Sequence, residues 1–444
     1  MESFNTFWAD AVSLVWGLPL VFLLTGAGVY FTIVTRFLPF RTFRHAIEII
    51  RGKYDNPDDP GEISHFQALS SALSSTIGMG NIAGVAVAVA VGGPGAVFWM
   101  WVSGLVGMTT KFFTCSLACM YRKVDEDGIA QGGPMYFIEL GLGKRYKFLA
   151  VMFSICGMVG TLSIFQSNQL SSLLSVDWGI PRLMTGTVSM VLVGMVVLGG
   201  ITRIGKATSR IVPVMCLLYF GACLYVVFSN LGEVPMLLMR IINNGLGLEA
   251  ALGGAAGLAL KEVMTTGIQR AAFSNEAGIG TAPMAHGAAK TKEPVREGLV
   301  AMLGPFVDTH IICTLTALVI LISGVSTDGG GIVMTAQAFE KAMPGFGKII
   351  LTVVVVMFAI SSMISLSYYG VKCAQYLFGK RLGWYYVYVY LLTLPLAAVW
   401  SQAAVLNIVD TAFALMAIPT ITSTLMLSPK VLAALKDYLQ RMNL

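Results

Sequence analysis

The chain has 444 residues, of which 56% are hydrophobic and only 12% are charged. Soluble domains carry about 25% charged residues, so this composition excludes an ordinary soluble protein. The net charge of +6 lies in short basic clusters between apolar runs, which is typical of membrane anchoring and does not indicate a nucleic-acid partner.

The apolar runs predict membrane-spanning helices. A helix needs about twenty apolar residues to cross roughly 30 Å of hydrocarbon, whereas barrel strands would show short alternating segments. We expect eleven spans, at residues 12–35, 64–90, 96–121, 147–173, 182–201, 208–229, 250–286, 298–324, 346–376, 383–402 and 404–428. The sequence therefore predicts an all-α polytopic membrane protein with 11 transmembrane helices. The first span is expected to be retained, because its leader carries Glu2 and Asp10 in place of lysines.

Two connecting segments are also expected to hold structure. Residues 41–54, RTFRHAIEIIRGKY, have helical spacing and are predicted to lie along the inner membrane surface. Residues 328–345, DGGGIVMTAQAFEKAMPG, are too polar to span. They indicate either a short external helix or a solvated connector.

Basic residues decide the predicted orientation, since Lys and Arg concentrate on the cytoplasmic side of a membrane. With eleven spans, the main clusters fall on one side; they lie at 36–53, 122–123, 144–147, 203–210, 290–296, 372–381 and 430–441. We therefore predict a multi-pass cell-membrane protein with its N-terminus outside and its C-terminus in the cytoplasm. The seven cysteines lie in or beside apolar segments with no histidine at ligand spacing, so neither disulfides nor a structural metal site is expected.

Small and polar residues interrupt two of the expected spans. Ser70 to Gly84 reads SSALSSTIGMGNIAG, and Thr266 to Pro283 reads TGIQRAAFSNEAGIGTAP. Broken helices at membrane depth are tolerated only where protein or water satisfies the backbone, and a matched pair indicates a transporter with inverted repeats. After the first span, ten spans divide into five and five of opposite orientation. The expected parts are an extra helix with its linker (1–60), a first repeat (61–230), a second repeat (231–428) and a cytoplasmic tail (429–444).

The composition of the interruptions favours ligand binding over packing alone. Gly80 and Gly84 form a small-xxx-small pair, which would also let helices approach closely. Packing does not explain Asn81, Asn275 and Glu276, because polar groups at membrane depth are costly. Free N–H groups at half-helix ends suit a carboxylate, and free carbonyls suit an ammonium or a small cation. An amino acid together with Na⁺ is the simplest solute that needs both.

Five stretches around these interruptions carry a family resemblance; they are GMGNIAGVAVAVAVGGPGAVFWMW, QGGPMYFIE, FSNEAGIGTAP, GPFVDTHIICTLTALVI and SYYGVKCAQYLFG. They resemble the alanine or glycine:cation symporter family, the sodium:alanine symporters. The resemblance implies a secondary transporter that imports a small neutral amino acid, alanine or glycine, coupled to Na⁺ by alternating access. It also implies a LeuT-type inverted-repeat fold with one extra N-terminal helix, in a lipid bilayer and with no obligate protein partner.

The resemblance further implies roles for individual residues. The implied substrate set is Gly78, Met79, Gly80, Phe165, Gln166, Phe273, Ser274, Asn275, Gly278 and Leu366. One Na⁺ would be held by carbonyls and hydroxyls of Ser74, Ile77, Phe358, Ser361 and Ser362. A second would use Thr76, Asn81 and Ser274.

Several alternatives stay open at this point. Leu366 stands where the family usually has Trp, which admits a larger neutral substrate such as glutamine. Coupling to H⁺ through Glu276 or Asp308 is a second alternative. Lys111 and Asp308 are expected to form pairs or gates, and Asp410 to cap or pair near the outer end of the last helices.

Two other classes of protein fit the sequence poorly. An intramembrane enzyme would show an HExxH motif, paired aspartates or a Ser–His arrangement within a span, and none is present. A channel would show a continuous polar stripe or a filter loop, whereas polarity here is concentrated at the two interruptions.

Overall fold

The computed structural model describes residues 2–124, 129–247, 256–326 and 330–444. The first half of the chain forms α1 (Glu2–Val15), α2 (Leu18–Val34), α3 (Leu38–Ile50), α4 (His65–Thr76), the π-helix η1 (Gly80–Gly84), α5 (Val85–Gly92), α6 (Gly95–Met120), β1 (Lys123–Val124), β2 (Ala130–Gln131), α7 (Pro134–Leu142), the 3₁₀ turn η2 (Lys144–Tyr146), α8 (Lys147–Gly160), α9 (Ile164–Trp178), α10 (Arg182–Val197) and α11 (Gly200–Ser229).

The regular elements described in the second half are all helices. It forms α12 (Val234–Gly245), α13 (Ala256–Asn275), α14 (Ala282–His286), α15 (Pro294–Ala301), α16 (Leu303–Pro305), the π-helix η4 (Phe306–Cys313), α17 (Thr314–Ser323), α18 (Gly331–Ala342), α19 (Gly347–Trp384), α20 (Tyr386–Val399) and α21 (Gln402–Met442).

The helices are long and apolar enough for a multi-pass membrane protein. Among the described residues, six helices pass this test, and two bent pairs raise the number to eight. The pairs are α1 with α2, bent by 46°, and α4 with η1 and α5, bent by 48°. Two shorter apolar helices, α10 and α20, coincide with further expected spans. The total of eleven stays a prediction, since residues 250–255 of the seventh expected span lie outside the described part.

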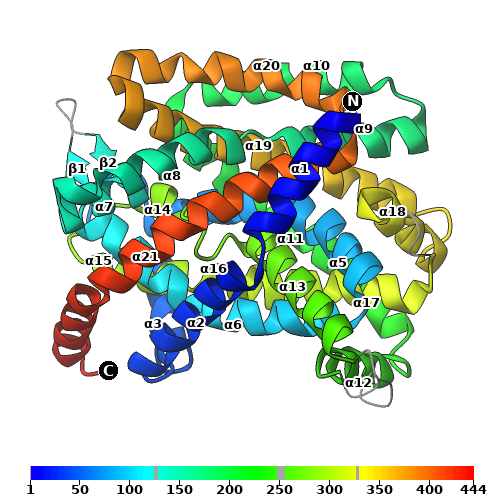
Figure 1. Cartoon of the computed structure of the whole chain (residues 1–444), viewed down its shortest axis with the longest axis horizontal. Coiled ribbons are helices and arrows are strands. Elements are labelled where there is room, and N and C mark those ends of the chain that lie inside the picture. The colour runs from blue at the N-terminus through cyan, green and yellow to red at the C-terminus, as the bar shows by residue number, and fades with distance from the viewer. Residues whose placement is uncertain (1, 125–128, 248–255, 327–329) are drawn as a thin grey trace.

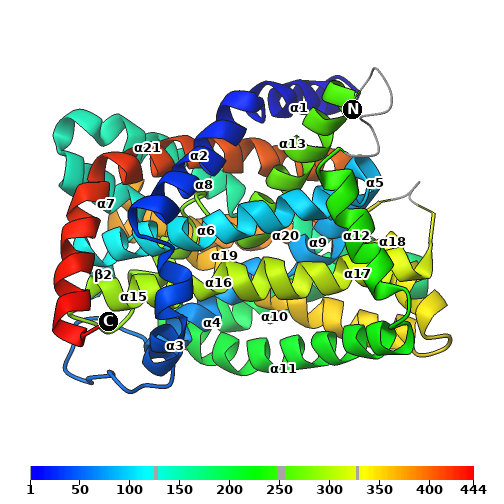
Figure 2. The same cartoon turned by 90° about the horizontal axis from the view of Figure 1, so that it is seen from below.

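The helices pack lengthwise around a buried centre. Figures 1 and 2 show α6, α11 and α17 running in a similar direction, with α3 and the C-terminus at one end of the bundle. The N-terminus, α12 and α18 lie at the opposite end in both views. These are called the α3 end and the α18 end below. The predicted surface helix at 41–54 corresponds to the amphipathic α3, and the predicted short helix at 328–345 to α18.

Both predicted interruptions exist, but each is shorter than expected. Helix α4 continues to Thr76, and regular structure stops only at residues 77 and 78. Helix α13 continues through Phe273 and Ser274 to Asn275, so the unwound part is residues 276–281. Residues 266–275, the first part of the stretch read as interrupted, are helical. Good helix formers such as Ala271 and Ala272 extend the helix, and the Glu276 N–H still bonds to the Ala272 carbonyl at 3.0 Å.

The structure adds features that hydropathy did not predict. A short antiparallel hairpin, β1–β2, departs from the all-α expectation. The span expected at 147–173 is divided at residues 161–163, and the span at 298–324 contains η4. The first expected span joins two helices, and the expected tail continues α21 as a helix. Pro419 and Pro429 lie inside α21, whose last part turns away from its first part in Figure 1.

Candidate substrate and cation site

The first break is held open by its own polar residues. Ser64 caps the start of α4 through a capping box with Gln67, and the helix ends where Ile77 becomes extended (φ −75°, ψ 94°). The Gly78 N–H donates to Oδ1 of Asn81 at 2.8 Å, and the Asn81 N–H donates back to the Gly78 carbonyl at 3.1 Å. These two hydrogen bonds between Gly78 and Asn81 close the loop, and η1 begins directly after it.

The second break begins with a left-handed residue. Glu276 has φ +54°, which stops α13, and Gly278 and Gly280 follow with φ +87° and +102°. Such conformations favour glycine, so the GxG spacing fits the break. The Ala277 N–H donates to Oδ1 of Asn275 at 2.9 Å and caps the turn.

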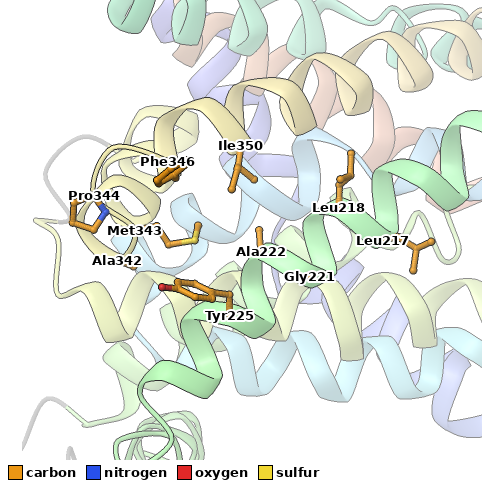
Figure 3. A pocket seen from close by; sticks show the side chains of 10 residues that line it. All are labelled: Leu217, Leu218, Gly221, Ala222, Tyr225, Ala342, Met343, Pro344, Phe346 and Ile350. Atoms are coloured by element: carbon orange, nitrogen blue, oxygen red, sulfur yellow. The ribbon is translucent and has the colours of Figure 1, made fainter.

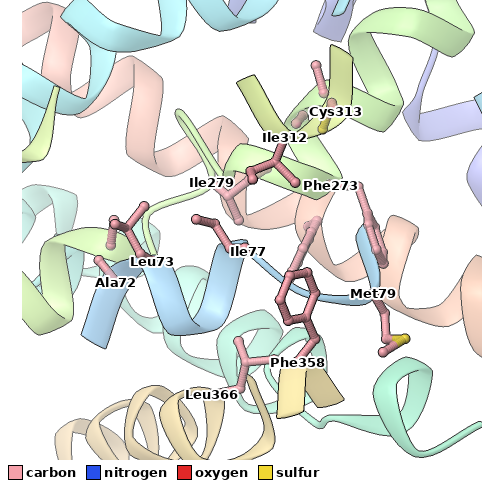
Figure 4. Packing of buried hydrophobic residues seen from close by; sticks show 14 of the residues in the cluster. Ala72, Leu73, Ile77, Met79, Phe273, Ile279, Ile312, Cys313, Phe358 and Leu366 are labelled. Carbon is pink, nitrogen blue, oxygen red and sulfur yellow. The ribbon is translucent and has the colours of Figure 1, made fainter. Parts of the chain in front are cut away.

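The two breaks meet at the centre of the molecule. A Cβ atom on Gly80 would lie 3.2 Å from Cα of Ser274 and 3.3 Å from the ring of Phe273. Figure 4 shows Ile77 and Met79 on either side of the first break, with Phe273 beside Met79. Gly80 therefore allows the backbone of one break to approach the helix end at the other.

Asp308 joins the two breaks. Its Oδ2 accepts from Nδ2 of Asn81 at 2.9 Å, and its Oδ1 accepts from the Ser274 hydroxyl at 2.7 Å. Thr309 donates to Oδ1 as well, at 2.9 Å. The carboxylate is fully buried within η4, so these donors replace the water it has lost. Sequence reasoning expected Asp308 to form a pair or a gate, and it did not predict the π-helix that carries this residue.

Glu276 makes a second link between the breaks. Its Oε2 accepts a hydrogen bond from Thr281 across its own loop and lies 3.5 Å from the Ser75 hydroxyl at the end of α4. Ser75 also lies 3.3 Å from the Tyr369 hydroxyl. Lys111, on α6, is also buried, and its expected role in a pair or a gate stays a prediction.

The residues proposed for the first cation site lie together. The Ser362 hydroxyl donates to the Ser74 carbonyl at 2.9 Å, and the Ser74 hydroxyl donates to the Ser361 carbonyl at 2.7 Å. The Ser361 hydroxyl lies 3.0 Å from the Phe358 carbonyl. A Cβ on Gly78 would lie only 2.4 Å from Oγ of Ser362. Oxygen atoms of α4 and α19 therefore converge where α4 ends, next to Ile77.

The residues proposed for the second cation site are only partly together. Asn81 and Ser274 share the Asp308 carboxylate, as described above. Thr76 instead points its hydroxyl at carbonyls of its own helix, Ala72 at 3.2 Å and Leu73 at 3.4 Å. The carboxylate of Asp308 supplies the anionic oxygen that the predicted set lacked.

The residues proposed for the substrate separate into two groups. The Phe165 ring packs edge-on against the Phe273 ring at 5.0 Å, and Phe273 lies beside Met79 in Figure 4. Leu366 is buried on α19, about two helical turns after Phe358. These residues and the nearly buried Gln166 of α9 form the first group.

Asn275 and Gly278 face other parts of the structure. Nδ2 of Asn275 donates to Thr309 at 2.9 Å, so this side chain connects α13 to η4. A Cβ on Gly278 would lie 2.8 Å from Leu24 and 2.9 Å from Ile421, which belong to α2 and α21. These two residues hold the second break against the neighbouring helices.

A buried ion pair lies beside the Phe273 ring. Arg270, on α13, pairs with Asp410 of α21, and its guanidinium lies 5.3 Å from the centre of the Phe273 ring. Gln269 donates to the same carboxylate at 3.0 Å, and the indole of Trp16 donates to the Asp410 carbonyl at 2.9 Å. The expectation that Asp410 forms a pair is confirmed. Its partner, Arg270, was not predicted.

Toward the α3 end, the inner halves of the broken helices are tied together. The Lys290 N–H donates to the Ile63 carbonyl at 2.8 Å, and Arg122 donates to four carbonyls from residues 60 and 287–291. Glu297 is fully buried and accepts from His65 and from His286, one on each carboxylate oxygen. Sequence reasoning missed this cluster, because its members are far apart along the chain.

Grooves at the surface of the bundle lie away from this centre. A groove of about 640 Å³ runs between α11 and the α18–α19 connection and is lined by apolar side chains, including Leu217, Tyr225, Met343 and Phe346 (Figure 3). It is open to the surroundings of the bundle, so we assign the site to the two breaks and not to this groove.

Comparison with known proteins identifies the relatives of this chain. Residues 1–443 match the sodium:alanine symporter family. The chain is 40% identical to the sodium/alanine symporter AgcS of Methanococcus maripaludis, over 96% of this chain and 95% of that protein. It is 34% identical to the probable sodium/glutamine symporter GlnT of Bacillus subtilis, over 96% of this chain and 89% of that protein.

Among solved structures, the fold is similar to MhsT in complex with L-phenylalanine. The TM-score is 0.58 at 15% identity, over 83% of this chain and 89% of that one. At this identity the likeness shows the fold alone, which is the expected LeuT-type transporter fold. The chain belongs to the sodium:alanine symporter family, and it is a membrane transporter and not an enzyme.

Proposed function

We propose that the chain imports a small neutral amino acid, alanine or glycine, together with Na⁺ by alternating access. The observation that carries this proposal is the meeting of the two breaks, where Gly80 packs on Ser274 and both helices contact Asp308. Backbone donors, carbonyls and one carboxylate converge there, which suits a zwitterion and a cation. The identity to AgcS, whose name gives sodium and alanine, supports the same reading.

The proposed Na⁺ ligands are oxygen atoms of α4 and α19. They are the Ser74, Ile77 and Phe358 carbonyls and the Ser361 and Ser362 hydroxyls. Na⁺ would replace the hydrogen bond between Ser362 and Ser74, which now connects the two helices at 2.9 Å. A second Na⁺ would use Asn81, Ser274 and Asp308. Since the first position borders Gly78, ion binding would order the break that receives the substrate, and coupling of this kind is reciprocal.

The proposed orientation has the α3 end in the cytoplasm of a cell membrane. The C-terminus lies at this end and the N-terminus at the other, as an odd number of spans requires (Figures 1 and 2). Under this orientation, Arg270 and Asp410 lie on the outer side of the site and Arg122 on the inner side.

Uptake into proteoliposomes tests the proposal. Purified protein is reconstituted with an inward Na⁺ gradient, and labelled alanine, glycine and glutamine are supplied one at a time. We expect Na⁺-dependent accumulation of alanine or glycine that a protonophore does not reduce. Accumulation without Na⁺, driven by a pH gradient, would contradict the proposed coupling and favour H⁺.

A larger neutral substrate is the second candidate. It is favoured by Leu366, which lies in the central region where the family usually has Trp, and by the identity to GlnT, whose name gives sodium and glutamine. Glutamine uptake exceeding alanine uptake in the same vesicles would decide for this candidate.

A further inference from the structure

A basic groove lies at the α3 end, far from the two breaks. It has a volume of about 680 Å³ and runs between the α2–α3 turn and the last part of α21. Three cationic side chains line it: Arg36, Arg41 and Lys436. The rest of its lining contains no acidic side chain. Leu432, Leu435 and Leu439 form an apolar wall on one face of α21.

The three cations have no anionic partner among the described residues. All three side chains are exposed, and no ion pair joins any of them to a carboxylate in the part of the chain described. Asp437, the acidic residue next to Lys436, is instead bound by Arg441 at 2.9 Å. Three cationic side chains face one α-carboxylate, that of Leu444, in the lining, so the groove keeps a net positive charge that suits an anion.

The α2–α3 turn beside the groove has features that are typical of a membrane surface. Arg36 and Phe37 both have left-handed backbones, with φ +53° and +57°, although neither is glycine. Such conformations are costly for residues with a Cβ and persist only where the surroundings hold them. Phe37 and Phe40 are 54% and 67% exposed, next to Arg36 and Arg41. Exposed aromatic rings beside cations on an amphipathic helix are typical of the headgroup boundary of a bilayer.

We propose that this groove binds an anionic phospholipid of the leaflet that surrounds the α3 end. The phosphate and any further headgroup charge would lie against Arg36, Arg41 and Lys436, and an acyl chain would lie along the leucines of α21. A lipid is favoured over a free anion, because cationic and apolar walls face the same space. Bound there, the lipid bridges the α2–α3 turn to α21. The proposal goes beyond amino acid transport and does not depend on the substrate.

Native mass spectrometry of the detergent-purified protein tests the site. Phosphatidylglycerol and phosphatidylcholine with the same acyl chains are titrated separately. We expect one phosphatidylglycerol to be retained preferentially. The triple variant Arg36→Gln, Arg41→Gln, Lys436→Gln should bind it roughly 100-fold more weakly, since each surface cation contributes about a fivefold effect. Lys436→Gln alone, an exposed single change, should give an intermediate loss.

A matched control has the same change of charge elsewhere at the surface. The variant Arg203→Gln, Lys206→Gln, Arg210→Gln removes three exposed cations of α11 and should leave lipid retention unchanged. Equal retention of both lipids, or equal losses in the two triple variants, would overturn the proposal. A stabilisation by inorganic phosphate that matches that of phosphatidylglycerol would show an anion site only and would also overturn it. Because lipid retention is measured without transport, failure here is distinct from failure of the proposed function.

Discussion

Nδ2 of Asn81 lies 2.9 Å from Oδ2 of Asp308, so the first broken helix is bonded directly to the π-helix η4. The other carboxylate oxygen accepts from Ser274 at the end of α13. One buried anion therefore connects three elements at the place where both helices are interrupted. The proposed site therefore depends most on the charge of the Asp308 carboxylate.

Replacing Asp308 by Asn should remove that charge with little change of shape. The new amide group would face donors from Asn81 or Ser274, so we expect a loss of about 2 kcal/mol at this junction. The Na⁺ concentration for half-maximal uptake should rise by roughly tenfold or more. Asp177→Asn is the matched control, because Asp177 pairs with Lys348, at 4.0 Å, near the α18 end. Unchanged Na⁺ dependence in Asp308→Asn would exclude Asp308 from the cation site.

Removing the Ser362 hydroxyl should weaken Na⁺ binding at the first position. Ser362→Ala deletes the group that now bonds to the Ser74 carbonyl, so the ion would lose one of its proposed ligands. We expect the half-saturating Na⁺ concentration to rise roughly tenfold, corresponding to about 1.4 kcal/mol. Ser367→Ala provides the comparison, since that hydroxyl donates only to the Ile364 carbonyl of its own helix. Equal effects of both variants would argue against a site at Ser362.

A methyl group on Gly278 should destabilise the fold. Its φ of +87° is unfavourable for Ala, and the new Cβ would lie 2.8 Å from Leu24. We expect Gly278→Ala to lower stability by about 1–3 kcal/mol, measured as a lower melting temperature in detergent. Gly26→Ala, in α2, meets nothing within 4 Å and should leave the melting temperature equal or slightly raised. A stable Gly278→Ala would show that the second break adapts more easily than its packing indicates.

Loss of Arg122 should loosen the α3 end. This side chain donates to the carbonyls of Pro60, Gly287, Ala289 and Thr291, which holds the segment before α4 against the segment after α14. Cys119 is buried beside them, with its thiol 3.4 Å from the His286 carbonyl. We expect Arg122→Gln to increase maleimide labelling of Cys119 by roughly tenfold, read from the labelled peptide.

The control for that change is Arg145→Gln, which removes an exposed arginine at the end of η2. It should leave Cys119 as protected as in the unmodified chain. If Cys119 stays unreactive in Arg122→Gln as well, the contacts of Arg122 are not what closes this end.

Restoring Trp at position 366 should shift the size preference of the transporter. Leu366 is 2% exposed, so a larger ring at this position would have to occupy space inside the bundle. Figure 4 draws it in the same buried cluster as Phe358 and Ile77. We expect Leu366→Trp to lower the uptake of glutamine relative to alanine by roughly tenfold. Leu366→Met, which conserves volume, should leave the ratio unchanged. An unchanged ratio in Leu366→Trp would remove Leu366 from the substrate wall.

Periodicity and composition alone determined the kind of protein and the place of its breaks. Long apolar runs require helices in a membrane, and Gly, Ser and Asn within such runs require a site where protein satisfies the backbone. Family motifs then assigned roles to Ser74, Ser361 and Ser362, and the structure brings these three together. The lengths of the breaks were less predictable, because packing and caps extend helices into sequences of low helix propensity.

Only the tertiary structure showed which residues, distant in sequence, contact the same buried charged group. Asp308, Asn81 and Ser274 are separated by up to 227 positions in sequence, and no local pattern relates them. The same holds for Arg270 with Asp410, for Glu297 with its two histidines, and for the basic groove between the α2–α3 turn and α21. Hydropathy records how much a residue prefers lipid or water. The position of a buried charge depends on the partners that neutralise it, and only the folded chain brings those partners within reach.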